Sequence, residues 1–178
     1  MNTPKPAFAV PYEFSRPLDV ESLVEGEPLG GHFQAHADEC AALAKRFDVL
    51  EISDFKAELT VLRPMGGRIE ITGVWQADVV QACVVTLEPI PAHLGGKIKE
   101  SLVGVASIAE LEESEVGLDS PEPFEGSVID LGEVLAQTLG VNLPPYPRKA
   151  GAVWQGGTQD APPESSHPLS DLARLLKE

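Results

Sequence analysis

The chain has few cysteines, no long apolar run and few basic residues. Its two cysteines, Cys40 and Cys83, fall in a predicted helix and a predicted strand, so they indicate no disulfide framework and fit a reducing compartment. No apolar run approaches the ~20 residues that cross a bilayer. Residues 1–6 lack the apolar core and cleavage site of a signal peptide. We therefore expect a cytoplasmic protein that does not bind membranes.

Basic residues are scarce relative to acidic ones. The 178 residues include 13 Lys and Arg against 28 Asp and Glu, for a net charge of −15. Such a chain repels phosphate at long range, which disfavours tight binding of nucleic acid and favours basic proteins as partners. The hydrophobic content of 43% is ordinary for a folded domain. The length allows one core of roughly 100–150 residues plus tails.

Motifs for catalysis are also missing. The glycine pairs at 66–67 and 95–96 lack the lysine and spacing of a phosphate-binding loop, and no serine lies in a Gly-x-Ser-x-Gly elbow. His32 and His36 are four residues apart, but no second ligand cluster accompanies them. A metal-dependent hydrolase built on these histidines is the least favoured alternative. We expect no enzyme activity, no metal and no cofactor.

Hydrophobic periodicity predicts an antiparallel meander. Apolar residues alternate with polar ones over residues 55–61, a turn follows at 64–67, and the alternation resumes from residue 68. Cys83, Val85 and Leu87 extend the pattern as a third strand that ends at Pro89. A further strand is predicted over 97–106, and short strands over 13–20 and 29–37. One face of this sheet should be buried and the other wet.

Two helices are predicted beside the sheet. Residues 37–47 have helical spacing with Asp38 as the N-cap. Asp130 and Glu133 form a capping box before a second helix, with Gly140 as its expected end. The predicted fold class is α+β: a curved antiparallel sheet of about five to seven strands, with closure toward a barrel as a further possibility, and two main helices packed against it.

The chain divides into one domain over residues 13–149, a flexible linker over 150–166 and a C-terminal helix over 167–178. Leu169, Leu172, Leu175 and Leu176 mark one face of that helix. A helix this short is unstable alone, so it must dock on the domain or on a partner. An acidic, proline-interrupted stretch over 107–127 is predicted to be a loop.

The segment 144–149 is the strongest candidate for a binding surface. Three prolines hold it extended, and it carries Tyr146, Arg148 and Lys149. The cations can pair with a phosphate or an acidic partner, and the tyrosine ring can stack. Arg63 and Arg68 flank the predicted hairpin turn and are the second pair of contact candidates. The competing interpretation is structural, with the prolines clamping the last helix and the tyrosine filling a groove.

Several blocks in the same order resemble the YceD family of large ribosomal RNA subunit accumulation proteins. They are residues 38–46 (DECAALAKR), 81–89 (QACVVTLEP), the acidic loop, 129–133 (IDLGE), 143–151 (LPPYPRKAG) and 167–172 (HPLSDL). Together they cover most of the chain from residue 13 onward, and this version resembles the alphaproteobacterial branch. Many relatives carry a second cysteine three residues after the first; here that position is Thr86. A zinc site is therefore not expected, and Cys83 is interpreted as a core residue.

The resemblance implies a cytoplasmic, non-catalytic factor needed for the synthesis, processing or stability of 23S ribosomal RNA. The expected partner is a ribosomal protein or another ribosome-assembly component. Any direct contact with ribosomal RNA is expected to be weak and salt-dependent. The alternative is a peptide- or protein-binding module unrelated to ribosomes, which uses a strand edge or the proline-rich segment.

Overall fold

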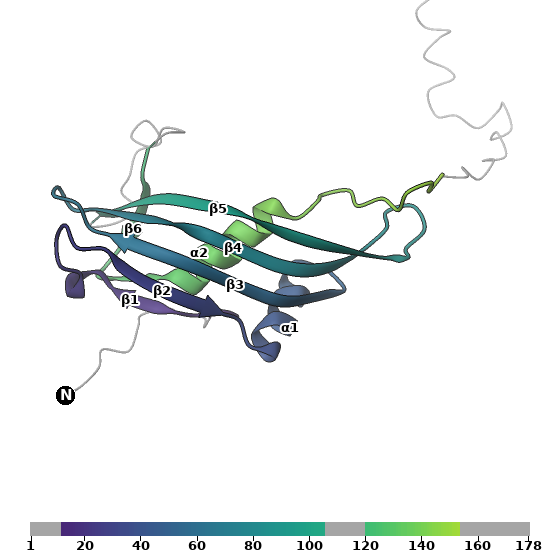
Figure 1. Cartoon of the computed structure of the whole chain (residues 1–178), viewed down its shortest axis with the longest axis horizontal. Helices are drawn as coiled ribbons and strands as arrows, with labels where there is room; N and C mark the ends of the chain where they lie inside the picture. Colours follow the sequence, from purple (N-terminus) through teal and green to yellow (C-terminus); the bar gives the residue numbers. More distant parts are fainter. Residues whose placement is uncertain (1–11, 106–119, 154–178) are drawn as a thin grey trace, which may run out of the picture.

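The computed structural model describes residues 12–105 and 120–153 and shows an α+β fold (Figure 1). The main sheet has five strands in the order β2 (Leu29–Gln34), β3 (Glu51–Leu62), β4 (Arg68–Ala82), β5 (Pro89–Val105) and β6 (Glu122–Glu125). All neighbours are antiparallel except β5 and β6, which are parallel. The predicted fold class is confirmed, but the sheet does not close into a barrel, so that further possibility is wrong.

The remaining elements lie around this sheet. The short strands β1 (Pro17–Asp19) and β7 (Val128–Asp130) form a second, two-stranded sheet, and a 3₁₀ turn, η1 (Val20–Ser22), follows β1. Helix α1 (Ala37–Arg46) connects β2 to β3, and helix α2 (Leu131–Asn142) follows β7. Figure 1 shows α2 running behind the main sheet, on the side opposite the viewer.

The third strand of the meander differs from the prediction. Residues 83–88 form a turn, and β5 begins at Pro89 rather than ending there. The strand predicted over 97–106 is the second half of this same β5. Proline lacks a backbone N–H, so it suggests the end of a strand. It is nevertheless tolerated at the first positions of a strand whose outer side is unpaired. The predicted strands on either side of the 64–67 turn are confirmed as β3 and β4.

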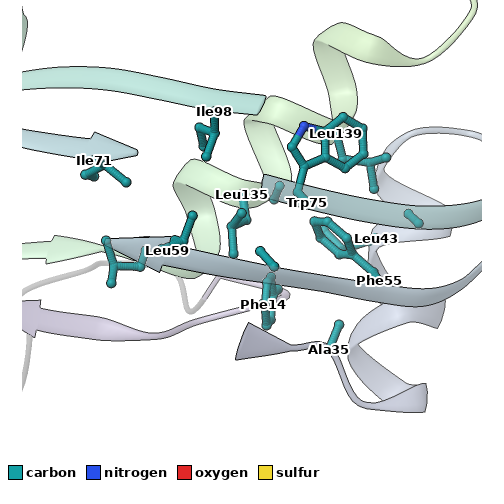
Figure 2. Close-up of a cluster of buried hydrophobic side chains, with 14 of the residues drawn as sticks. Phe14, Ala35, Leu43, Phe55, Leu59, Ile71, Trp75, Ile98, Leu135 and Leu139 are labelled. Atoms are coloured by element: carbon teal, nitrogen blue, oxygen red, sulfur yellow. The ribbon is translucent and has the colours of Figure 1, made fainter. Parts of the chain in front are cut away.

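The core lies between the sheet and α2. Strand side chains alternate between this buried face and the open face. The ring of Phe55 lies 5.5 Å from that of Phe14 and 6.4 Å from that of Trp75. Leu135 and Leu139 of α2 pack against the same cluster (Figure 2). Burial of apolar surface at about 25 cal/mol per Å² therefore couples α2 to the middle of the sheet.

Both helix starts are stabilised by side chains that accept backbone N–H groups. The N-cap of α1 is His36, not Asp38, and the His36 N–H donates to Glu39 at 2.8 Å. For α2 the predicted cap is confirmed, because Asp130 Oδ1 accepts the N–H groups of Gly132 at 2.9 Å and Glu133 at 3.2 Å.

Helix α2 continues past its expected end at Gly140. It runs to Asn142. A Cβ atom at position 140 would lie 2.8 Å from the ring of Phe47. This glycine therefore permits the end of α1 to pack closely against α2, and it does not terminate the helix.

Ion pairs connect the two helices and the N-terminal segment. Arg46 of α1 forms two 2.7 Å hydrogen bonds with Glu133 of α2, and it also contacts Glu13 at 3.1 Å. Arg16 pairs with Glu39 at 2.7 Å.

No helix in residues 12–105 and 120–153 is long and apolar enough to span a membrane.

Candidate functional site

The turn between β4 and β5 forms one end of the molecule. Cys83 N–H donates to the Glu88 carbonyl and Leu87 N–H donates to the Cys83 carbonyl, both bonds being 2.8–2.9 Å long. Leu87 has φ of 61°, a left-handed conformation that costs a residue with a side chain about 1–2 kcal/mol. Its side chain is nevertheless 77% exposed. The turn thus holds a leucine in solvent at a conformational cost.

Cys83 is the buried centre of this turn. Its Sγ accepts the backbone N–H groups of Lys149 at 3.4 Å and of Val85 and Thr86 at 3.5 Å. Hydrogen bonds lower the pKa of the Cys83 thiol to about 6, with the Lys149 N–H as the largest cause and Thr86 as the next. The reason is that hydrogen bonds to a thiolate favour its charged form. The side chain is fully buried, as the sequence predicted, but it lies in a turn and not in the predicted strand.

The candidate segment 144–149 is fixed against this turn. Gln81 Nε2 donates to the Pro144 carbonyl at 3.0 Å, and Val84 N–H donates to the Pro147 carbonyl at 2.9 Å. Lys149 Nζ lies 3.1 Å from Glu88 Oε2. Segments more than 60 residues apart in sequence therefore form one surface, which sequence periodicity cannot reveal.

The three predicted contact residues of this segment differ in how accessible they are to a binding partner. Tyr146 is 77% exposed and does not fill a groove, so that part of the competing interpretation is wrong. Arg148 is exposed, and no ion pair joins it to another described residue. Lys149 is exposed but is partly occupied by its pair with Glu88. Tyr146 and Arg148 are therefore the more available contacts.

A groove of about 540 Å³ with both polar and apolar walls lies beside the segment. We name it the end groove. Its lining is mostly aliphatic and proline side chains, and it comprises Phe47, Asp48, Gln81, Ala82, Cys83, Val84, Leu87, Gly140, Leu143, Pro144, Pro145 and Pro147. Val84 at 46% and Leu87 at 77% exposure are apolar members that are open to solvent. Exposed apolar side chains grouped in a groove can serve as contacts for a partner.

Other hollows lie elsewhere on the described structure. Two of about 400 and 500 Å³ lie on the open face of the sheet around His32, Glu58 and Val74, and their walls mix polar and apolar strand residues. One of about 670 Å³ lies between α1 and the start of β3, and four of its lining residues are alanines. None of these three hollows is lined by the segment 144–149.

The second predicted pair lies at the opposite end of the sheet. Arg68 starts β4, whereas the end groove adjoins the last residues of β4. Fifteen residues of strand at about 3.3 Å each separate the two ends by roughly 45 Å. Arg63 is half-buried and donates to the Val20 carbonyl at 3.2 Å, while Arg68 is exposed. The structure thus does not bring the two predicted cationic pairs together.

The histidines occupy separate environments. His32 lies on the open face 3.4 Å from Glu58, and His36 precedes α1. His93 Nδ1 lies 2.7 Å from Asp78 Oδ1 on the same open face. Within the described part of the chain, no group of three His, Cys, Asp or Glu side chains is placed to hold a metal ion.

Comparison with family models gives a match to this chain. The model of a family described as "Large ribosomal RNA subunit accumulation protein YceD" matches residues 71–175, which is more than half of the chain. No curated protein and no solved structure matches the chain. The matched span contains every residue that lines the end groove except Phe47 and Asp48.

Proposed function

Because the chain belongs to the YceD family of large ribosomal RNA subunit accumulation proteins, we propose that it is a ribosome-biogenesis factor. Its role is non-catalytic, takes place in the cytoplasm, and supports the synthesis, processing or stability of 23S ribosomal RNA. Assignment to the alphaproteobacterial type is part of the same proposal and rests on the resemblance of the sequence blocks. The family match supports the general role in ribosome biogenesis. The surface of the molecule supports the proposed mode of action, which is binding of a partner in the end groove.

The end groove is the observation that carries this mode of action. Its lining includes the exposed apolar side chains of Val84 and Leu87. It lies beside a segment that contains three prolines, and the exposed ring of Tyr146 is in that segment. Aromatic and apolar side chains supply most of the energy in protein interfaces. The net charge of −15 favours a basic partner. We therefore assign the groove to a ribosomal protein or another basic assembly component.

A non-catalytic role agrees with the chemistry of the described residues. The Cys83 thiol is enclosed and bonded by three N–H groups. The His93–Asp78 pair is exposed on an open sheet face, where water competes for both groups. Neither arrangement presents an activated nucleophile to a substrate.

Complementation in cells tests this proposal. In a strain that lacks the gene, the wild-type gene should restore the ratio of large to small ribosomal RNA. Tyr146→Ala and Leu87→Glu should fail to restore it, because Leu87 lines the end groove, Tyr146 is exposed in the segment beside it, and neither residue is in the core. Met65→Glu is the matched control, since Met65 is 86% exposed at the opposite hairpin. A normal ratio with normal precursor ends in the deletion strain would refute the role.

The alternative is a protein-binding module unrelated to ribosomes. This alternative is supported by the outer edge of β5. Among the described residues, that edge pairs with a strand, β6, only from Leu102 onward, so its earlier part has no described partner strand. Capture of partners from lysate by the wild type and by Tyr146→Ala separates the two. Recovery of ribosomal components by the wild type alone supports the ribosomal role, and recovery of other proteins only supports the module.

A further inference from the structure

The end groove has a candidate occupant in the chain itself. The described structure ends at Val153, four residues after Lys149, whose N–H bonds to Cys83 in the wall of the groove. Val153 is 76% exposed. The 25 residues that follow therefore leave from beside the groove.

These remaining residues carry an apolar pattern that complements the exposed side chains of Val84 and Leu87 in the groove. Leu169, Leu172, Leu175 and Leu176 recur at spacings that share one face of a helix. The spacing of Ser170 and Arg174 predicts that they fall on the other face of such a helix. The segment 167–178 lies outside the described residues, and its leucines need an apolar surface because so short a helix is unstable alone.

We propose that segment 167–178 docks its leucine face in the end groove of its own chain. The 15 residues between Val153 and Leu169 can span about 50 Å when extended, far more than the groove requires. A tether of this length gives an effective concentration in roughly the millimolar range. The groove volume of about 540 Å³ suits several aliphatic side chains. Intramolecular docking thus covers Leu87 and Val84 until a partner displaces the segment.

Photo-crosslinking of the isolated full chain tests this docking. A benzophenone amino acid replaces Leu87, and irradiation at low protein concentration is followed by mass spectrometry of the peptides. We expect crosslinks to residues 167–178 in a product of monomer mass. The same probe at Met65, exposed at the opposite end of the sheet, should give none.

Two variants of the segment sharpen the test. Leu172→Glu should lower the crosslink yield about tenfold, because it removes an apolar anchor. Ser170→Glu adds the same charge on the opposite face and should leave the yield unchanged. A product of dimer mass would assign the groove to a second copy, and no crosslink to the segment would overturn the proposal. No ribosomal component is present, so the result is independent of the proposed function.

Discussion

At the scale of single residues, Cys83 shows how backbone geometry changes a side chain's chemistry. In the sequence it is one apolar residue in an alternating pattern. In the structure three N–H groups converge on its sulfur, two from its own turn and one from Lys149. The pKa of the Cys83 thiol therefore depends on its contact with the segment 144–149, since the Lys149 N–H is the largest cause of the lowered pKa.

This pKa predicts how stability depends on pH. The pKa of Cys83 falls from 9.0 in the unfolded chain to about 6 in the fold, so between these values the unfolded state binds more protons. The free energy of unfolding should therefore rise with pH from about 6 to 9, and Cys83→Ser should remove that rise. Urea denaturation at several pH values measures it.

Cys40 provides the control for that experiment. Burial raises the pKa of the Cys40 thiol above 9.0, so below about pH 8 it stays protonated in both the folded and the unfolded state. The difference in free energy of unfolding between the wild type and Cys40→Ser should therefore be independent of pH from about 6 to 8. If the free energy of unfolding depends on pH in the same way in the wild type and in Cys83→Ser, the hydrogen bonds assigned to the Cys83 sulfur are contradicted.

At the scale of elements, the joint between α1 and α2 shapes the end groove. Phe47 at the end of α1 packs on Gly140 of α2, and both line the groove. Arg46 holds the same joint through its two bonds to Glu133, whose side chain is only 11% exposed. Loss of this pair would leave a carboxylate without its main partner in a largely buried position.

Arg46→Gln should therefore lower the free energy of unfolding by about 1–3 kcal/mol, because a mostly buried carboxylate loses its charged donor. Lys56→Gln is the matched control, since the Lys56–Asp54 pair is largely exposed on the open face. That variant should change stability little. Equal effects of the two substitutions in urea denaturation would argue against a special role for the helix joint.

At the scale of the whole molecule, the predicted contacts are distributed over two distant ends. Arg148 lies exposed beside the end groove, whereas Arg63 is engaged with the Val20 carbonyl near the opposite hairpin. A net charge of −15 surrounds both. RNA that binds this chain can therefore use only a few phosphate contacts at one time.

Binding of a ribosomal RNA fragment to the purified chain should accordingly be weak and should decrease with salt. The slope of log K against log salt should be about −1 to −2, and Arg148→Ala should reduce it by about one. Arg63→Ala should leave it unchanged, because its guanidinium serves the fold. Fluorescence anisotropy over a salt series measures the slope, and binding that is insensitive to salt would refute this picture.

The sequence alone determined the α+β class, strands β3 and β4, both main helices and the burial of Cys83, because these follow from local periodicity and capping. The sequence misplaced the start of β5, because a proline indicates a strand boundary but does not indicate whether the strand begins or ends there. Only the tertiary structure decided that residues 83–88 and 144–149 form one surface and that Arg63 lies far from Arg148. The reason is that such proximity comes from pairing along β4 and from packing of α2, neither of which is encoded in neighbouring residues.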